Sequence, residues 1–245
     1  MRTFWGLLLA ATFAPLAAAL ALPALADEAQ IRKVLEPKLG GAKIEGIERG
    51  PLGLYEVRFR GEDGVRILYT DATATHIVVG KIYETKADKD LTEVRLRKFN
   101  AIKFDELPLA QAVKVQRGNG KRVLVMFSDP HCPYCTKFEQ TLQQVDNITV
   151  YVFMFPVIKP DLADHSKAVW CSPDRAKAWI DLALRGKPPA ASASCENPVA
   201  KNLELGQKLG VNSTPTLYLA NGERVAGALS PEDLREMLDK VASSK

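Results

Sequence analysis

The sequence predicts a small α+β domain followed by an α/β domain with a mixed sheet. Three observations support this prediction. Strand-like alternation of apolar and charged residues fills much of the first third of the chain. From about residue 110, buried-type strands alternate with amphipathic helices. The last three elements then read strand, strand and helix, which adds an antiparallel hairpin to the second sheet.

The N-terminal segment indicates export. After a basic start, residues 4–22 form an apolar run, and Ala24-Leu25-Ala26 follows as a small-x-small cleavage signature. The alternative is a membrane anchor, because the run is nearly long enough to span a bilayer. Pro15 and Pro23 interrupt the run and favour cleavage. We expect a signal peptide over residues 1–26, a mature chain that starts at residue 27, and a periplasmic location.

The small domain is predicted over residues 27–86. Ile31, Val34 and Leu35 recur at helical spacing, and strand patterns follow near residues 55–59, 65–69 and 77–83. A core of about 60 residues is marginal by itself, and a short meander leaves an open edge strand. Both features favour a partner subunit. A polar break then opens a predicted linker helix over residues 87–109.

The second domain is predicted over residues 110–245. Residues 123–127 and 148–158 read as buried strands, and three helical patterns lie between residues 161 and 209. Asn221-Gly222 marks a hairpin turn. Ser230 is the expected N-cap of the last helix, with Pro231 at its first position. The net charge of +4 is modest and no basic run stands out, so nucleic-acid binding is not indicated.

The four cysteines carry most of the functional information. In an exported chain an even number suggests disulfides, and four cysteines allow three pairings. Cys132 and Cys135 form a C-x-x-C motif, whereas Cys171 and Cys195 are isolated. The economical arrangement is one local redox pair and one structural bridge.

The C-x-x-C lies between a predicted buried strand and an amphipathic helix. Free backbone N–H groups and the helix dipole stabilise a thiolate at such a helix start. We therefore expect Cys132, at the tip and more exposed, to attack, and Cys135, one turn inside, to resolve mixed disulfides. Pro133 and Tyr134 between them, and His131 before them, are expected to tune the redox chemistry. A zinc half-site or a merely structural disulfide is the alternative, but the strand–motif–helix context favours redox activity.

At these residues the chain resembles the thioredoxin superfamily. Ser213-Thr214-Pro215-Thr216 matches the segment in which that superfamily carries a cis proline facing the active-site cysteines. The resemblance implies a thioredoxin-like fold and a substrate that pairs with the backbone of Thr214 beside Pro215. Thioredoxin has a buried Asp six residues before its first active-site cysteine. Met126 stands there in this chain, so no carboxylate base is expected at that place.

The whole mature chain resembles the periplasmic disulfide isomerase family of DsbC and DsbG. The matching segments are residues 127–130 before the C-x-x-C, residues 168–171, residues 209–211 before Thr214-Pro215, and residues 75–80 in the small domain. The resemblance implies a V-shaped homodimer, and a membrane reductase of the DsbD type that restores the dithiol. Pro-Tyr between the cysteines is closer to DsbG. The pair Cys171 and Cys195 matches DsbC, where it forms a structural disulfide, and favours DsbC.

The predicted function is therefore isomerisation or reduction of non-native disulfides in misfolded secreted proteins. Thiol–disulfide exchange requires no cofactor or metal. A disulfide oxidase on the same fold is one alternative. A holdase chaperone with incidental cysteines is another.

Overall fold

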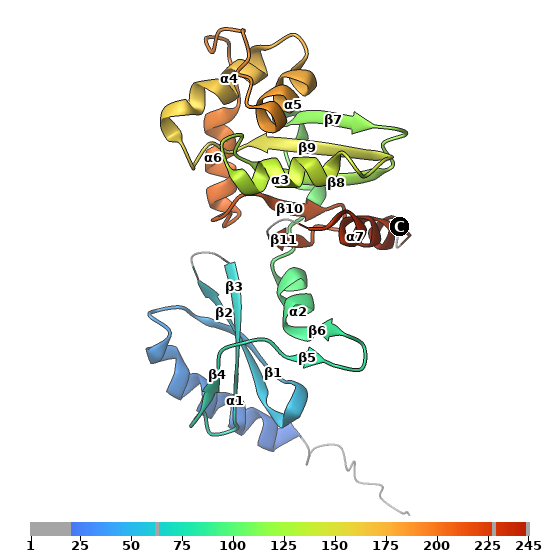
Figure 1. The fold of residues 1–245 in the computed structure, drawn as a ribbon. Helices are drawn as coiled ribbons and strands as arrows, with labels where there is room; N and C mark the ends of the chain where they lie inside the picture. Colours follow the sequence, from blue (N-terminus) through green and yellow to red (C-terminus); the bar gives the residue numbers. More distant parts are fainter. Residues whose placement is uncertain (1–20, 62–63, 227–228, 244–245) are drawn as a thin grey trace, which may run out of the picture. The chain divides into compact units, whose positions relative to one another are not determined.

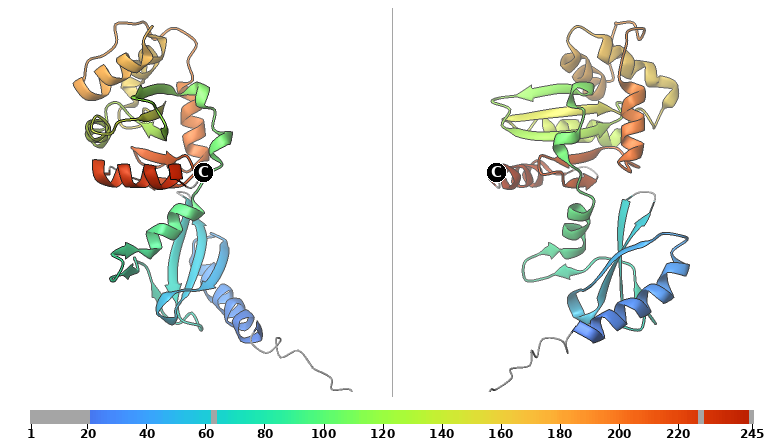
Figure 2. Two further views of the ribbon diagram at one scale, coloured as in Figure 1. Left: turned by 90° about the vertical axis from the view of Figure 1, so that its right-hand side faces the viewer. Right: turned by 180° about the vertical axis from the view of Figure 1, so that it is seen from behind.

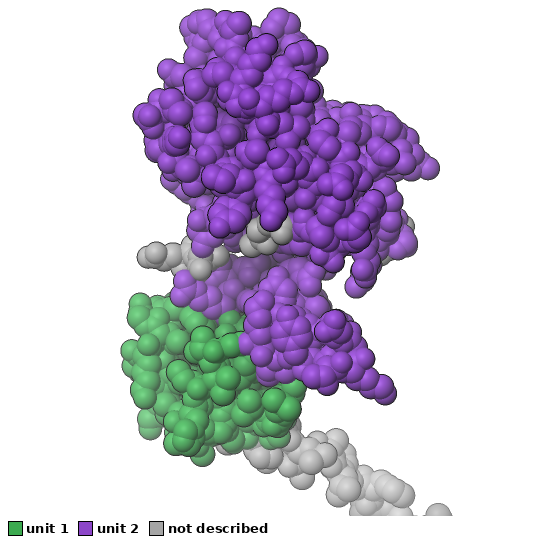
Figure 3. Space-filling model, in the orientation of Figure 1, with its two compact units in different colours: residues 1–59, 67–80 green, residues 60–66, 81–245 purple. Residues whose placement is uncertain are grey.

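A computed structural model describes residues 21–61, 64–226 and 229–243, and these form two compact units. The first comprises the described parts of residues 1–59 together with residues 67–80, and the second comprises residues 60–66 and those from 81 onward (Figure 3). Residues 1–20 of the predicted signal peptide lie outside the described residues. Within the described part, no helix is both long and apolar enough to cross a membrane.

The first unit consists of a helix packed on a sheet (Figure 1). Helix α1 (Ala21–Leu35) precedes a sheet of strand order β1-β2-β3-β4. The strands are β1 (Ile44–Arg49), β2 (Tyr55–Gly61), β3 (Gly64–Thr70) and β4 (Ile77–Val78). Ile31 and Leu35 of the helix are buried against Ile44, Val57 and Leu68 of the sheet. The predicted helix-plus-meander is therefore confirmed.

Two strands of this region differ from the sequence-based prediction. Strand β1 was not predicted, because a register shift between Ile44 and Gly46 breaks its apolar alternation. In the sequence, Ile44 and Ile47 are three residues apart, which is a helical spacing. The strand predicted near residues 77–83 is two short strands, β4 and β5 (Tyr83–Glu84).

The segment after β4 belongs to the second unit. Strand β5 pairs with β6 (Lys89–Asp90), and α2 (Leu91–Phe99) follows. The Asp90 side chain caps α2 by accepting from the Glu93 backbone N–H at 2.8 Å. The helix ends well before Pro108, because the chain then joins the larger sheet region, where Ile102 N–H donates to the Gly222 carbonyl at 2.9 Å. Short 3₁₀ turns at Phe104–Glu106 and Leu109–Gln111 complete the connection.

The larger sheet has the strand order β11-β10-β8-β9-β7 (Figure 1). Its strands are β7 (Val113–Arg117), β8 (Arg122–Ser128), β9 (Ile148–Met154), β10 (Thr216–Leu219) and β11 (Arg224–Ala226). Strands β8 and β9 are parallel, and the other neighbours are antiparallel. The mixed sheet is as predicted, apart from β7, an edge strand absent from the prediction.

Helices cover both faces of this sheet (Figure 2). They are α3 (Pro133–Leu142), α4 (Ala163–Cys171), α5 (Arg175–Arg185), α6 (Val199–Lys208) and α7 (Pro231–Ser243). Met126 of β8 points to the face covered by α3, α5 and α7, whereas its neighbour Phe127 points to the face of α6. This alternation makes β8 a central strand buried on both sides. Helix α7 begins as predicted, since Ser230 Oγ accepts from the Asp233 backbone N–H at 3.1 Å.

Candidate active site

The C-x-x-C motif occupies the junction between β8 and α3. Cys132 is the N-cap of α3, Pro133 is its first residue, and the Cys132 carbonyl accepts from the Thr136 backbone N–H at 3.1 Å. Cys135 lies one turn into the helix. A buried strand followed directly by a helix start therefore places one sulfur at the positive end of the helix dipole.

Both motif cysteines are free thiols, and both are buried. Cys132 is 3% exposed and Cys135 is 0% exposed. Cys132 was predicted to be the more exposed of the two, and the observed difference is small. The residues between them, Pro133 and Tyr134, are exposed. Tyr134, at 68% exposure, is one of the large apolar side chains most open to solvent among the described residues.

The proline loop, which contains Thr214 and Pro215, contacts Cys132. The Thr214–Pro215 bond is cis, and Thr216 follows as the first residue of β10, opposite Phe127 of β8. This pairing brings the loop to the end of β8, where the Cys132 sulfur donates to the Thr214 carbonyl at 3.4 Å. The residues singled out by sequence, Thr214 and Pro215, thus lie beside the C-x-x-C.

Burial controls the second cysteine. It raises the pKa of the Cys135 thiol to about 12, because a thiolate loses its hydration inside the protein. The Ser128 hydroxyl, the Asp129 backbone N–H and the Thr214 hydroxyl oppose this rise, and the Cys132 charge reinforces it. At neutral pH Cys135 is consequently a protonated thiol.

A buried carboxylate organises the loop in front of the motif. Asp129 is 1% exposed and accepts three backbone N–H groups. One donor is His131 at 2.8 Å, and the others are Val157 and Ile158, each at 2.7 Å. Asp129 thereby ties the loop before α3 to the loop after β9 with hydrogen bonds of the stronger, charge-assisted kind. No sequence pattern indicated this role for Asp129.

His131 has a ring partner that the sequence did not reveal. Its Nε2 lies 3.1 Å from Nδ1 of His165 in α4, although His165 had no evident partner in the sequence. Burial lowers the pKa of His131, the His165 and Lys159 charges lower it further, and the Asp129 and Asp161 charges raise it. His131 is therefore mainly neutral at pH 7, so the tuning of Cys132 predicted for it would not rest on a full positive charge at that pH.

A second carboxyl is buried in the helix that carries the motif. Glu139 of α3 is 2% exposed, and its Oε1 accepts from the Trp179 indole N–H at 2.6 Å. Burial raises the pKa of Glu139 to about 7, against the opposing effects of Trp179 and Arg117. Glu139 was not predicted as a site residue, because a Glu in an amphipathic helix is usually solvated.

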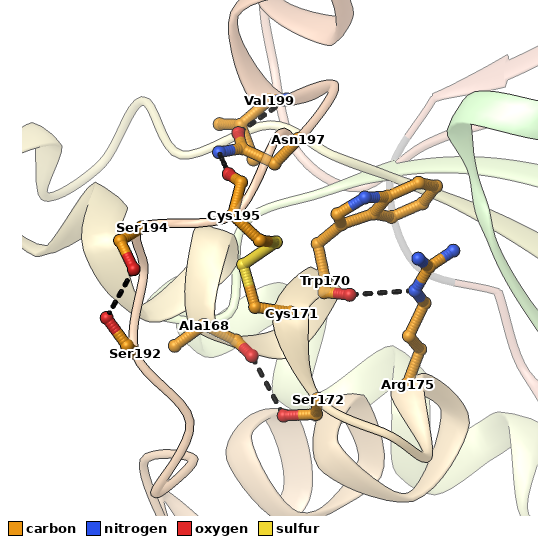
Figure 4. The surroundings of a disulfide bond; sticks show 10 residues. All are labelled: Ala168, Trp170, Cys171, Ser172, Arg175, Ser192, Ser194, Cys195, Asn197 and Val199. Atoms are coloured by element: carbon orange, nitrogen blue, oxygen red, sulfur yellow. Dashed lines mark hydrogen bonds between the residues drawn. A yellow bond between two sulfur atoms is a disulfide. The ribbon is translucent and has the colours of Figure 1, made fainter.

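Cys171 and Cys195 are joined in a disulfide (Figure 4). Cys171 is the last residue of α4, and Cys195 lies in the segment between α5 and α6. Local hydrogen bonds surround the bond: Ser172 Oγ donates to the Ala168 carbonyl at 2.8 Å, and Asn197 Nδ2 donates to the Cys195 carbonyl at 3.0 Å. Among the described residues, no group of three or more His, Cys, Asp or Glu side chains is arranged to hold a metal ion.

A sheet with a C-x-x-C at a helix start and a cis proline beside it defines a thioredoxin-like protein of thiol–disulfide exchange. A thioredoxin-like domain model matches residues 109–242, and a disulfide bond isomerase protein N-terminal domain model matches residues 22–93. The chain belongs to the DsbC family of thiol:disulfide interchange proteins.

The relatives compared by sequence cover most of the chain. The probable thiol:disulfide interchange protein DsbC of Bordetella parapertussis is 38% identical over 208 residues, covering 85% of this chain and 73% of the relative. DsbC of Escherichia coli K12 is 29% identical over 232 residues, covering 91% and 93%. The crystal structure of a disulfide interchange protein from Neisseria gonorrhoeae matches with a TM-score of 0.53 at 41% identity, over 56% of this chain and 99% of that one.

Proposed function

We propose that this protein isomerises, and to a lesser extent reduces, non-native disulfides of secreted proteins, with Cys132 attacking and Cys135 resolving. The observation that carries the proposal is the contrast between the two sulfurs. Cys132 lies at the N-cap of α3, where helix N–H groups favour a thiolate. Cys135 is fully buried, and burial raises its thiol pKa to about 12.

The reaction begins when the Cys132 thiolate attacks a substrate disulfide. One substrate sulfur leaves as a thiolate and takes up a proton, while the other forms a mixed disulfide with Cys132. If a second substrate thiolate then attacks that sulfur, a new substrate disulfide forms and Cys132 is released unchanged in redox state. If Cys135 attacks instead, the enzyme is oxidised by two electrons and the substrate leaves as a dithiol.

The pKa of Cys135 bears on the choice between these outcomes. Only its thiolate can attack, and at neutral pH that form is scarce because burial raises the pKa of Cys135. The mixed disulfide therefore persists long enough for a substrate thiol to compete. This favours isomerisation over reduction.

The substrate is proposed to dock in extended form beside the proline loop. The Thr214 carbonyl, which accepts from Cys132, and the neighbouring Pro215 offer backbone to a passing strand. Exposed Pro133 and Tyr134 flank the attacking sulfur and suit apolar segments of an unfolded chain.

The test is refolding of a scrambled disulfide protein with the reduced enzyme. The parent should restore native pairing, and Cys132→Ala should not. Cys135→Ala should still attack and should accumulate mixed disulfides, because its resolving thiol is gone. Equal adduct formation at both positions, or equal loss in both variants, would contradict the assignment of roles.

We also propose that residues 27–86 form a dimerisation domain, joined by the linker over residues 87–109 to the catalytic domain over residues 110–245. Strand β4 is at the edge of the first sheet, and Ile77, Val78 and Val79 are 53%, 50% and 77% exposed. Such an apolar edge is suited to pairing with a second copy about a two-fold axis.

A charged substitution on this edge tests the dimer. Val78→Glu should shift the protein from dimer to monomer in analytical ultracentrifugation at micromolar concentration. Leu52→Glu is the matched control, because Leu52 is an exposed apolar residue on a 3₁₀ turn outside β4. A monomeric parent would overturn the proposed dimer.

Location and redox partner complete the proposal. The predicted signal peptide and membership of the DsbC family support a periplasmic enzyme. There a membrane thiol reductase of the DsbD type would return Cys132 and Cys135 to the dithiol after each reductive turnover. Alkylation trapping in cells tests this: a mainly reduced pair supports the isomerase, and a mainly oxidised pair supports an oxidase.

A further inference from the structure

The resolving step presents a chemical problem. Cys135 must become a thiolate to attack the mixed disulfide, yet it is fully buried, and Met126 occupies the place where thioredoxin has a buried carboxylate. The one carboxyl of the same helix, Glu139, is buried and paired with Trp179, and it is not among the groups with the largest effect on the ionisation of Cys135. Stabilisation of the Cys135 anion must come from other groups.

Two buried hydroxyls near Cys135 have no ordinary hydrogen bond. Ser128 is 0% exposed, and its Oγ has no partner of normal distance and angle among the described residues. Thr214 is partly buried, and its Oγ1 atom is buried and likewise has no such partner. Buried hydroxyls are rarely left unpaired in folded proteins, so each such group calls for an explanation.

The Cys135 sulfur supplies that explanation. The Ser128 and Thr214 hydroxyls lie near enough to it to oppose the effect of burial on its ionisation. A protonated thiol is a weak acceptor, which leaves the hydroxyls unpaired, whereas a thiolate is a strong, charged acceptor. Ionisation of Cys135 would therefore give both hydroxyls a strong acceptor.

Ser128 is the better placed of the two. It is the last residue of β8, aligned with Met154 of β9, and its carbonyl accepts from the Phe155 backbone N–H at 2.8 Å. Its hydroxyl is thus held by the central part of the sheet. Thr214, in contrast, belongs to the loop whose backbone meets Cys132 and the proposed substrate.

We propose that the Ser128 hydroxyl is a catalytic hydrogen-bond donor that stabilises the Cys135 thiolate as it attacks the mixed disulfide on Cys132. Cys135 loses its proton to water, and its sulfur uses an electron pair to form the bond to the Cys132 sulfur. The bond between Cys132 and the substrate breaks, and the substrate sulfur leaves with the bonding pair and is protonated. Ser128 keeps its own proton throughout and donates only a hydrogen bond.

This inference rests on the proposed roles of Cys132 and Cys135, and the experiment separates the two. The full-length reduced protein is converted to a mixed disulfide with glutathione, and mass spectrometry of peptides locates the adduct. Release of glutathione is then followed after rapid mixing across pH 6–9. An adduct on Cys135 rather than Cys132 would refute the proposed roles before Ser128 is tested.

Three variants test Ser128. Ser128→Ala should slow release of glutathione roughly tenfold, the effect of losing one hydrogen bond to a charged group. Ser128→Thr, which keeps a hydroxyl, should restore most of the rate. Ser166→Ala is the matched control, because Ser166 in α4 is also fully buried with an unpartnered hydroxyl and is not one of the groups that act on Cys135.

The pH dependence checks that the step under test is attack by the Cys135 thiolate, and rescue by Ser128→Thr separates a hydrogen-bonding role from a structural one. In the parent the release rate should rise with pH in proportion to the Cys135 thiolate. In Ser128→Ala the same line should be displaced by about one pH unit to higher pH, matching the tenfold change. An undisplaced line in a folded Ser128→Ala protein, or an equal displacement in Ser166→Ala, would overturn the proposal.

Discussion

The two cysteine pairs, Cys132 with Cys135 and Cys171 with Cys195, lie in different surroundings. Cys132 and Cys135 lie at the start of α3, unbonded, with buried hydroxyls beside them that lack partners. Cys171 and Cys195 are bonded, 24 positions apart in sequence, and their neighbours form ordinary local hydrogen bonds. Unpartnered buried hydroxyls therefore lie beside the C-x-x-C motif. The described residues drawn around the Cys171–Cys195 bond in Figure 4 contain no such group.

The helix ends account for much of this difference. Cys132 caps the N-terminus of α3, where free N–H groups stabilise an anion. Cys171 ends α4, where carbonyl groups with partial negative charge disfavour one. The same side chain is therefore favoured as a nucleophile at one site and as half of a permanent bond at the other.

The largest expected effect is on disulfide exchange activity, when the cysteines of each pair are substituted in turn. Cys132→Ala should reduce protein disulfide exchange to the uncatalysed background. The Cys171→Ala/Cys195→Ala double variant should keep most of the exchange activity when folded. The two rates are compared by refolding of a scrambled substrate below the melting temperature of both variants. Loss of exchange in a folded double variant would break the comparison.

The converse holds for stability. The Cys171–Cys195 bond closes a loop with a sequence separation of 24, for which the chain-entropy model gives about 3–4 kcal/mol. Urea unfolding of the double variant should show this loss. Cys132→Ala, which removes no bond from the dithiol form, should unfold close to the parent. Equal midpoints for double variant and parent would contradict a structural role for the second pair.

A smaller effect on stability is expected from Glu139, which lies on the same helix as Cys135. The folded pKa of Glu139 is raised to about 7, above its value in the unfolded chain, so the folded state holds the proton more tightly. Stability should therefore fall as pH rises from about 4.5 to 7. Glu139→Gln keeps an acceptor for Trp179 and removes the titration, so at pH 8 it should gain up to about 3 kcal/mol.

Urea unfolding at pH 5 and pH 8 checks this expectation. The difference between the two pH values should shrink in Glu139→Gln. Glu139→Ala is the control that removes both the charge and the acceptor, and it should be less stable than Glu139→Gln at both values. An unchanged pH dependence in Glu139→Gln would show that ionisation of this carboxyl does not lower the stability of the protein.

The smallest effect concerns His131. Because burial and the neighbouring charges hold its pKa below the usual value, the ring is mainly neutral at pH 7. His131→Asn should change the alkylation rate of Cys132 by less than about threefold at pH 7.5, with a larger difference near pH 5.5, where the parent ring gains charge. His76→Asn, in the first unit, is the control.

The sequence predicted those parts of the fold that depend on local pattern. The buried runs of β8 and β9, the Asn221-Gly222 turn and the Ser230 cap are each specified by neighbouring residues. Strand β1 was missed because a bulge between Ile44 and Gly46 disturbs the alternation on which the prediction depends.

The site residues that belong to a sequence motif could be predicted. The site residues that are defined by tertiary contacts could not. The C-x-x-C and Thr214-Pro215 stand out in the sequence. Asp129, His131 and Glu139 each have a partner that is 28, 34 or 40 positions away, respectively, and no periodicity links these pairs. Ser128 carries no signal at all, because only the fold shows that its hydroxyl is buried without a partner.

Helix α4 joins the two regions compared above. Its first turn carries His165, which touches the His131 ring, and its last residue is Cys171, which is covalently fixed to Cys195. Nine residues of α-helix make a stiff rod of about 13 Å. A displacement at the bonded end is therefore transmitted to the imidazole at the other end. The ring protons of His131 are consequently expected to report spectroscopically on the integrity of the Cys171–Cys195 bond.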